Sequence, residues 1–404
     1  MTKLCTKKEV DRLALLFALT YMISYITRIN YGAIVAEMEG ATQLSKSMLS
    51  MALTGSFITY GAGQILTGIF GDRLSPKKLV SCGFIITILM NILIPICNNP
   101  YQMLAVWSVN GFAQAFMWPP MVKLMVNLLS DEDYKNTTVK VSWGAAAGTI
   151  AVYLISPILI LYFGWKSVFV FSAICAIVML VLWNKFSYEV NEENTQNTTE
   201  EKSFNIKFLL NPVMILVMAA IALQGMLRDG TTTWMPSYIA ETYSISSEIS
   251  ILTGVILPIF HIVSTRIALA VYVKKFKNPV SCAGIFFAAG AVGAIMLIMT
   301  TGRNAAVSIL SMSVLNGCMH GVNTLFTCMM PPFFYRYGRV STMAGILNAC
   351  VYIGSAMSTY VIAIFADKYG WNFNLISWLV IALGGALICF ACAKPWAKRY
   401  IDEK

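Results

Sequence analysis

Hydrophobic residues in this sequence are gathered in long blocks that are spread evenly over the whole chain. Each block holds about 20 residues, enough to cross the roughly 30 Å hydrocarbon layer of a bilayer as a helix. Six blocks lie in the first half, at residues 13–36, 48–70, 79–97, 101–126, 139–162 and 166–184, and six in the second, at 212–240, 249–273, 280–300, 304–330, 341–365 and 373–393. The pattern predicts an all-α membrane protein with twelve transmembrane helices.

One long polar stretch separates the two groups of six blocks. It runs from Asn184 to Asn211 and is rich in Glu and Asn. This composition is typical of a solvated linker. We therefore predict an N-terminal six-helix bundle at residues 1–184, a linker at 185–211 and a C-terminal six-helix bundle at 212–404.

Loops rich in lysine and arginine alternate along the chain with loops that hold few of either. If the N-terminus is cytoplasmic, the outside loops hold only Lys46, Lys166, Arg303 and Lys368. Loops that carry most of the positive charge stay in the cytoplasm, so both termini are predicted to be cytoplasmic. The same bias accounts for the net charge of +10 without a nucleic-acid partner. The first block is too long for a cleaved signal peptide.

Composition excludes several classes of protein. The chain is 57% hydrophobic and 12% charged, whereas a soluble domain is about 25% charged. Its 10 cysteines are mostly scattered through apolar blocks, where they act as small hydrophobes. The single Cys-x-x-Cys pair, Cys389 and Cys392, has no second pair, so we predict no metal and no cofactor. Catalytic residue types are not grouped at useful spacings, and no enzyme activity is predicted.

The two halves of the sequence repeat each other. Asn110-Gly111 recurs as Asn316-Gly317, and Gly164-Trp165 recurs as Gly370-Trp371. Both pairs are about 206 residues apart, and the offset drifts smoothly to Arg28 and Arg228. Two pseudo-symmetric six-helix halves are the usual construction of a transporter that rocks about a central site.

Arg28 and Arg228 are the residues that membrane burial makes most costly. A charge at the centre of a membrane helix costs about 2.5–3.5 kcal/mol, and such residues are usually functional. Each arginine lies about 22 Å along its helix, so the two sit at matching depths. The alternative is that each arginine pairs with a carboxylate or snorkels to an interface, but Asp229, the neighbour of Arg228, is expected to point about 100° away. We therefore expect both arginines to face a central cavity unpaired.

Two guanidinium groups at one cavity favour an anion as ligand. The planar fork of arginine donates two parallel hydrogen bonds to phosphate or carboxylate. Arg266 lies nearer the cytoplasmic end of its block, where snorkelling to the interface is the better interpretation.

At these residues the chain resembles the organophosphate:phosphate antiporters of the major facilitator superfamily. The resemblance rests on four stretches: Arg28-Ile29-Asn30-Tyr31, Tyr60 to Gln64 with Gly68, Asp72 and Arg73, Trp118-Pro119-Pro120, and Arg228-Asp229-Gly230 with Trp234, Pro236 and Tyr238. It implies the major facilitator fold, alternating access and a phosphate held by Arg28 and Arg228. It also implies a bacterial inner-membrane location, a monomer, and exchange of an organic phosphate for inorganic phosphate.

The resemblance extends the set of expected substrate contacts. These are Asn30, Tyr31, Gln64, Trp118, Trp143, Trp234 and His320, besides the two arginines. It further implies a conformational latch made of Gly68, Asp72 and Arg73, for which simple membrane-edge topology is the alternative. The family's glycerol-3-phosphate branch has lysine at the positions of Ile29 and Gln64, and histidine where we align Trp143. The pocket is therefore expected to be less positive than in that branch.

Coupling remains open between three modes. A cavity with two unpaired arginines resists closing because closure desolvates both charges, which favours exchange of one bound anion for another. His261 and His320 lie inside apolar blocks and keep proton coupling open, since histidine titrates near neutral pH. A non-transporting sugar-phosphate sensor is the third mode, and sodium coupling is a variant of the second.

Overall fold

The computed structural model describes residues 6–70, 74–188, 211–331, 333–334 and 340–401, and within these ranges the chain is almost entirely helical. The first half contains α1 (Lys7–Ala33), α2 (Val35–Thr42), α3 (Lys46–Phe70), α4 (Pro76–Leu93), η1 (Ile94–Ile96), α5 (Pro100–Gln114), α6 (Trp118–Leu128), α7 (Asp131–Phe163) and α8 (Lys166–Phe186). The second half contains α9 (Pro212–Tyr243), α10 (Ser247–Thr253), α11 (Ile256–Val271), η4 (Tyr272–Phe276), α12 (Pro279–Thr300), α13 (Ala305–Thr324), η5 (Leu325–Met329), α14 (Val340–Tyr369) and α15 (Trp371–Tyr400).

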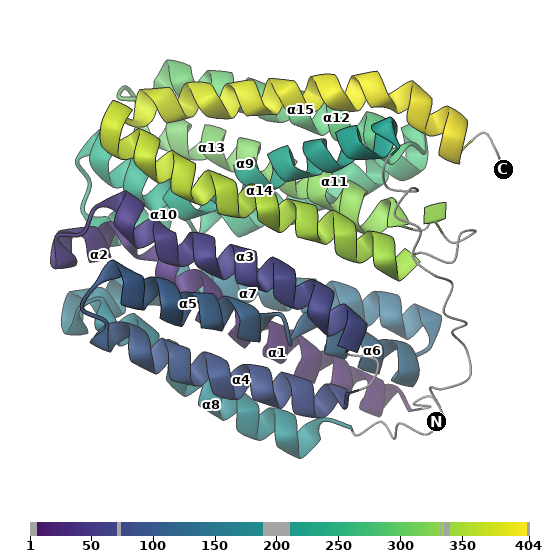
Figure 1. Ribbon diagram of the computed structural model, residues 1–404, viewed down its shortest axis with the longest axis horizontal. Coiled ribbons are helices and arrows are strands. Elements are labelled where there is room, and N and C mark those ends of the chain that lie inside the picture. The colour runs from purple at the N-terminus through teal and green to yellow at the C-terminus, as the bar shows by residue number, and fades with distance from the viewer. Residues whose placement is uncertain (1–5, 71–73, 189–210, 332, 335–339, 402–404) are drawn as a thin grey trace. The chain divides into compact units, whose positions relative to one another are not determined.

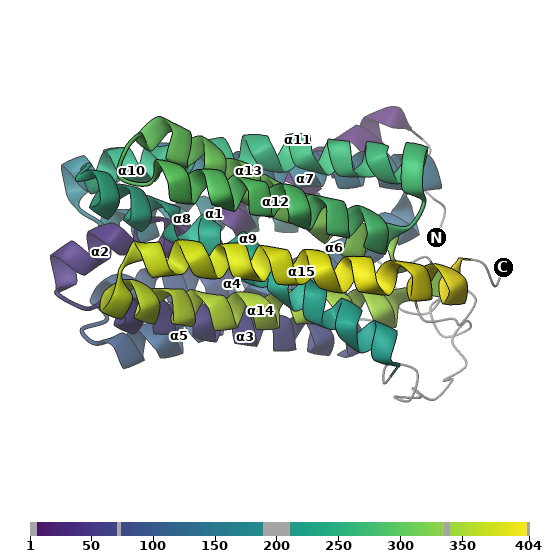
Figure 2. The same ribbon diagram turned by 90° about the horizontal axis from the view of Figure 1, so that it is seen from above.

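The chain folds into two compact units. The first holds residues 1–38 and 51–203, and the second holds residues 39–50 and 204–404. In the first unit α7 and α8 pack on α1, and α8 also packs on α4 (Figure 1). In the second unit α14 packs on α9, while α12 lies between α13 and α15 (Figure 2). The sequence did not indicate that residues 39–50, from the first half of the chain, group with the second unit. Most of the polar linker lies outside the described residues.

Ten helical stretches of the described residues are long and apolar enough to cross a membrane. They match ten of the twelve predicted blocks. The other two blocks correspond to α3 and to the pair α5–α6. The α5–α6 block is interrupted at residues 115–117, where Ala115, Phe116 and Met117 donate to carbonyls three residues back instead of four. Pro119 and Pro120 follow in the first turn of α6, where a proline needs no helical N–H, so the second helical segment begins there.

The repeated Asn-Gly pair has one structural role in both units. In the first unit the Nδ2 of Asn110 on α5 donates to the carbonyl of Thr27 on α1 (3.2 Å). A Cβ on Gly111 would lie 2.2 Å from the carbonyl oxygen of Ser56 on α3. The asparagine therefore ties the fourth predicted span to the first, and the glycine lets it touch the second.

The second unit uses its copy of the pair in the same way. Asn316 on α13 donates to the carbonyl of Arg228 on α9 (2.8 Å). A Cβ on Gly317 would lie 3.0 Å from the carbonyl oxygen of Phe260 on α11. Each asparagine thus bonds the backbone at or beside the membrane arginine of its own unit. The internal repeat that the sequence indicates is present in the packing.

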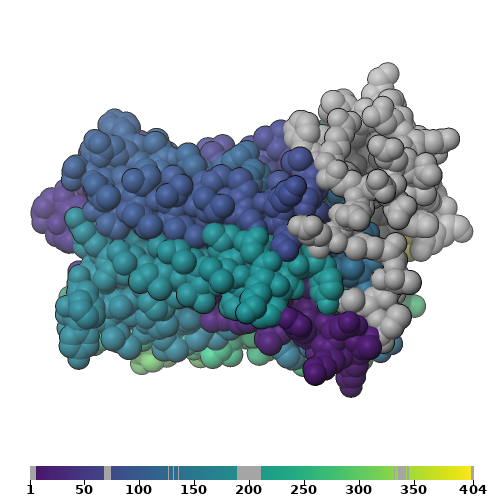
Figure 3. Space-filling view, turned by 90° about the horizontal axis from the view of Figure 1, so that it is seen from below, coloured from purple at the N-terminus to yellow at the C-terminus, as the bar shows by residue number. Residues whose placement is uncertain are grey.

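The outer helices of the first unit carry an apolar surface. Figure 3 looks onto a face formed largely by α4 and α8. Large exposed side chains on these two helices are Ile85, Leu89, Ile92, Leu93, Val170, Ile174, Ile177, Val178 and Val181. A water-soluble protein rarely exposes so continuous an apolar face. Contact with lipid hydrocarbon explains this face. Its side chains are apolar, and a helix can lie against lipid because its backbone N–H and C=O groups are hydrogen-bonded within the helix.

Candidate functional site

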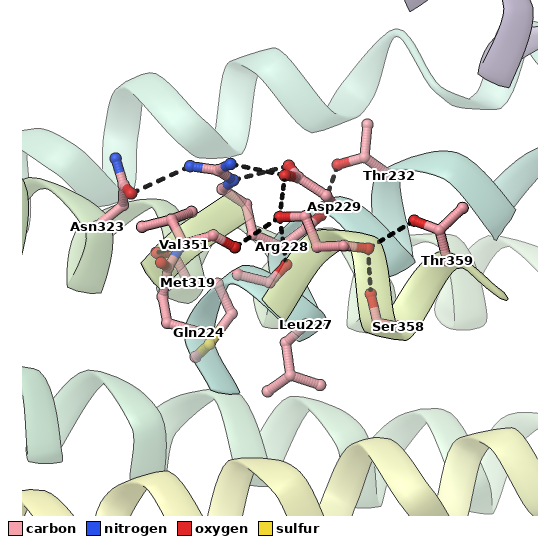
Figure 4. Close-up of polar contacts among 12 residues, drawn as sticks. Gln224, Leu227, Arg228, Asp229, Thr232, Met319, Asn323, Val351, Ser358 and Thr359 are labelled. Carbon is pink, nitrogen blue, oxygen red and sulfur yellow. Dashed lines mark hydrogen bonds and ion pairs between the residues drawn. The ribbon is translucent and has the colours of Figure 1, made fainter. Parts of the chain in front are cut away.

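Arg228 lies in the middle of α9, inside the second unit, and its side chain is only 10% exposed. Its Nε donates to Oδ1 of Asp229 (2.7 Å) and its Nη2 donates to Oδ2 (2.6 Å). On the other side, Nη1 donates to Oδ1 of Asn323 (3.0 Å) on α13. Figure 4 shows the guanidinium held between these two side chains. The ring of Tyr352 on α14 lies 5.9 Å from the guanidinium carbon.

The expectation that Arg228 is unpaired is wrong. Neighbouring Cα–Cβ directions on a helix do diverge by about 100°, but the long arginine side chain folds back far enough to meet the carboxylate. In a site of low effective dielectric the attraction between two opposite charges is several times stronger than in water. That gain outweighs the preferred side-chain directions. The fork of Arg228 is therefore bidentate to an anion that the protein itself supplies.

Asp229 is held from a second helix as well. The hydroxyl of Ser355 on α14 donates to Oδ2 of Asp229 (2.5 Å). The backbone beneath is fixed by Asn316, whose Nδ2 also donates to the hydroxyls of Thr231 (2.8 Å) and Thr232 (2.9 Å). Buried polar groups that are joined in this way are rigid and expensive to break one at a time. The carboxylate is thus positioned by α9 and α14 together.

The two histidines form a stacked pair beside this cluster. The rings of His261 on α11 and His320 on α13 are 3.8 Å apart, with planes inclined by 19°. His320 lies one helical turn before Asn323, so both residues share a face of α13. The sequence expectation that His320 belongs with Arg228 is therefore compatible with its position. Sequence reasoning missed Asn323, Ser355 and the stacking of His261 on His320, because nothing in the spacing marks them.

Arg28 lies on α1 of the first unit in a different setting. Its guanidinium carbon lies 4.4 Å from the ring centre of Tyr25 and 5.0 Å from that of Tyr60 on α3. A cation over an aromatic face is stabilised by the ring quadrupole, by about 2 kcal/mol or more when both are desolvated. Aromatic faces therefore contribute to holding Arg28, and a carboxylate contributes to holding Arg228.

Two further predicted contacts lie in the surroundings of Arg28. The ring of Trp118, at the start of α6, is 5.2 Å from that of Tyr21, which is 5.1 Å from that of Tyr25. Gln64 lies one turn after Tyr60 on α3. It is only 9% exposed, and its Nε2 has no hydrogen-bond partner among the residues that the structure describes. A buried amide donor normally has a partner, and a ligand could supply one.

Trp143 lies on α7 next to Gly144, whose missing side chain lets α7 approach Ala18 of α1 closely. Its side chain is 51% exposed, so it lies at the surface of the first unit.

Three other predicted contacts are enclosed in the packing of their units. Asn30 donates to Oδ1 of Asn91 (2.8 Å) and to Oγ of Ser172 (3.0 Å). Tyr31 packs between the rings of Trp107 and Phe169. Trp234 donates from Nε1 to the carbonyl of Thr359 (3.2 Å). All three side chains are fully buried and bond or pack within their own units, so we leave them out of the proposed site.

The structure does not describe the side chains of the predicted latch. Asp72 and Arg73 lie outside the described residues, and Gly68 lies in α3 where the side-chain environment is not described. The described residues contain no group of three or more His, Cys, Asp or Glu side chains that could hold a metal ion.

A second charged cluster, which the sequence did not reveal, surrounds Lys46. The Nζ of Lys46 lies 3.2 Å from Oε1 of Glu39, 3.1 Å from Oε1 of Glu241 and 3.9 Å from Oδ1 of Asp367. Burial raises the pKa of Glu39 although Lys46 opposes it, and the two other carboxylates add to the rise. Burial alone would lower the pKa of Lys46, but the carboxylates of Glu241 and Glu39 outweigh it and raise it. The cluster joins residues 39–50 to the ends of α9 and α14.

We expect Lys46→Gln to lower the stability of the second unit by about 1–2 kcal/mol. Removing one partner from a buried ion pair is strongly destabilising, but the exposed carboxylates here reduce the loss. The measurement is the apparent melting temperature of the purified protein in detergent, which should fall by several degrees. Lys46→Arg keeps the charge and should melt near the wild type. Lys166→Gln removes an exposed lysine and is the control; equal melting of the Lys46→Gln and Lys166→Gln proteins would contradict the prediction.

When the chain is compared with known proteins, one family model matches most of its length. The family model described as Major Facilitator Superfamily matches residues 17–359. Among curated proteins, the glycerol-3-phosphate transporter of Bacillus subtilis is 23% identical over 89% of this chain and 87% of its own length. The membrane sensor protein UhpC of Salmonella typhimurium is 24% identical over 56% of each chain.

Solved structures agree on the fold. A bacterial homologue of the human lysosomal transporter Spinster, in an inward-facing and occupied conformation, superposes with a TM-score of 0.80 over 98% of this chain and 99% of that chain. Its sequence is 13% identical, so the likeness concerns the fold alone. This likeness confirms the all-helical fold, and the family match confirms the assignment to a transport family rather than to an enzyme class.

Proposed function

Because this chain belongs to the Major Facilitator Superfamily, as the match over residues 17–359 shows, we propose that it is a secondary transporter of a small organic anion. The proposed substrate is a phosphate ester, exchanged for inorganic phosphate by alternating access. The observation that carries the proposal is the presence of one membrane arginine at the corresponding place in each unit, Arg28 on α1 and Arg228 on α9. A relative named as a glycerol-3-phosphate transporter supports the substrate class.

The chemistry around Arg28 fits a phosphate ester. A guanidinium group recognises two phosphate oxygens with parallel hydrogen bonds. The rings of Tyr25 and Tyr60 lie beside this guanidinium and help to hold it in place. Trp118 and Tyr21 add an aromatic surface nearby, and the amide of Gln64 can donate to a hydroxyl or phosphate oxygen. The proposed ligand therefore combines a dianionic group with a small polar or apolar remainder.

We place the chain in the bacterial inner membrane as a monomer that crosses the bilayer many times. Both termini are assigned to the cytoplasm, because Lys and Arg are concentrated in the segments that this orientation puts inside.

One observation favours a second candidate. Strict exchange requires an empty carrier whose two arginines are not neutralised, but Arg228 carries Asp229 as a counter-ion. An empty carrier with a neutralised Arg228 meets a smaller desolvation barrier when it closes. Net uptake coupled to protons is therefore the alternative mode. A sensor role is the other alternative, since one relative is named a membrane sensor.

Uptake by reconstituted vesicles tests the proposal. Vesicles loaded with inorganic phosphate should take up radiolabelled glycerol-3-phosphate or glucose-6-phosphate, and uptake should be several-fold lower in vesicles without internal phosphate. Equal uptake in both, together with sensitivity to a collapsed pH gradient, would replace exchange by proton coupling. Binding without flux would indicate a sensor. If neither an organic phosphate nor inorganic phosphate binds to the purified protein, the proposed function is wrong.

A further inference from the structure

The two membrane arginines are equivalent in the internal repeat but differ in their electrostatic surroundings. The residue after Arg28 is Ile29, and the guanidinium of Arg28 lies over the rings of Tyr25 and Tyr60. The residue after Arg228 is Asp229, whose carboxylate binds the guanidinium of Arg228 through both oxygens. The second unit therefore carries its own anion in direct contact with the arginine that the substrate is proposed to bind.

The carboxylate of Asp229 occupies Arg228 in the way a ligand anion does. Two parallel N–H to oxygen bonds of 2.7 and 2.6 Å join Nε and Nη2 to the two carboxylate oxygens. This is the bidentate geometry by which arginine recognises phosphate and carboxylate groups in general. A substrate oxygen that takes this edge of Arg228 has to displace Asp229.

Asp229 has one other described hydrogen bond to hold it after displacement. Ser355 on α14 donates to its Oδ2, and a hydroxyl can stabilise either a carboxylate or a protonated acid. Among the described residues, the titratable groups beside the pair are Tyr352 on α14, near the guanidinium, and the stacked His320 and His261 on α13 and α11, which both interact electrostatically with Arg228. The side chain of Asp229 is 17% exposed, so water reaches it and can deliver a proton.

We propose that Asp229 couples anion transport to protons by occupying Arg228 when the site is empty, yielding Arg228 to the substrate anion, and taking up one proton as it does so. This inference rests on the proposed function. The charges balance at each stage: Arg228 with ionised Asp229 is neutral, and Arg228 with one charge of the bound anion and protonated Asp229 is also neutral. If Asp229 stayed ionised after displacement, a largely buried negative charge would lose its cationic partner, which is unfavourable.

The proton enters from the water on the side to which the site is open. It leaves on the other side, when the substrate dissociates and Asp229 binds Arg228 again. The same cycle lets the empty carrier return, because Arg228 is then neutralised by Asp229. The cycle is compatible with exchange of one bound anion for another, and it adds net uptake of the anion together with a proton.

The test measures proton uptake on binding, with inorganic phosphate as the probe. Binding to the detergent-purified full chain is followed by titration calorimetry in two buffers of different ionisation enthalpy, at pH 8 where the probe is mostly dianionic. The wild type should take up close to one proton per phosphate bound. Asp229→Asn should take up close to none, and should bind phosphate more tightly because the competing carboxylate is gone. The probe's own titration is common to both proteins and cancels in the difference.

Asp11→Asn is the matched control. Asp11 on α1 is an exposed aspartate that pairs with Lys140 (2.7 Å), so its amide variant should keep the proton uptake and the affinity of the wild type. Wild-type binding without proton uptake overturns the inference even if Asp229→Asn does not fold. So does equal uptake by wild type and Asp229→Asn, or weaker binding by Asp229→Asn, which would make Asp229 a positioning residue. If phosphate binds to none of the proteins, the proposed function falls as well.

Discussion

Replacing either Arg28 or Arg228 with alanine should raise the dissociation constant for the transported organic phosphate by at least about 100-fold. Each arginine is proposed to give the substrate two hydrogen bonds to a charged acceptor, and such bonds contribute about 1.5–3 kcal/mol each. Since about 1.4 kcal/mol corresponds to a factor of ten in affinity, the loss of one bidentate contact is enough for this effect. Equilibrium binding of a radiolabelled phosphate ester to the purified protein measures it.

Control variants separate the effect of the planar pair of guanidinium donors from the effect of the positive charge. Arg28→Lys and Arg228→Lys keep a positive charge but lose the planar donor pair, so we expect an intermediate loss of about tenfold. Arg266→Ala removes an arginine of α11 that is exposed, and it should leave the affinity unchanged. A phosphate ester that bound equally well to the wild type, Arg28→Ala and Arg228→Ala would show that the arginines do not form the site.

The sequence is enough to single out Arg28 and Arg228 as candidate site residues, because the free-energy cost of placing a charge in a membrane helix does not depend on how the helices pack. A charge within an apolar block stands out in any helical arrangement, and the internal repeat then relates the two positions. The repeat itself was recognisable from a dipeptide, since the close contacts of Asn110-Gly111 and Asn316-Gly317 each need one amide donor and one residue without a side chain.

The environment of each arginine could not be predicted in the same way. Side-chain torsions decide whether Arg228 reaches Asp229, and helical spacing alone indicates that neighbours diverge. Asn30 and Arg28 are only two residues apart, yet Asn30 bonds Asn91 and Ser172 inside the first unit. A family pattern marks both residues without distinguishing a ligand contact from a packing contact.

The ion pairs at the ends of the helices could not be predicted from the sequence either. Lys46 is an ordinary loop lysine by composition, and its three carboxylate neighbours come from α2, α9 and α14. Residues so far apart along the chain meet only after the helices have packed. The membership of residues 39–50 in the second unit is a consequence of that packing.

A methyl group at Gly354 is expected to be among the most damaging small changes in the second unit. A Cβ there would lie 1.9 Å from the carbonyl oxygen of Ala222, and a Cβ at Gly225 would lie 2.1 Å from that of Val351. These are contacts between the backbones of α14 and α9, so no side chain can move aside. Overpacking of a tight core costs about 1–3 kcal/mol and more where the backbone must shift, and we expect Gly354→Ala to reach at least about 3 kcal/mol.

The damage should reach the arginine cluster, because Ser355 follows Gly354 and donates to Asp229. Gly345→Ala supplies a matched control in the same helix, since a Cβ there meets nothing within 4 Å. The apparent melting temperature in detergent should fall by roughly 6–12 °C for Gly354→Ala, at about 2–4 °C for each kcal/mol lost, and should stay near the wild-type value for Gly345→Ala. Equal melting of the two variants would mean that α9 and α14 are not packed backbone to backbone at this point. A lower melting temperature for Gly354→Ala with an unchanged phosphate affinity would separate the packing of α14 from the position of Asp229.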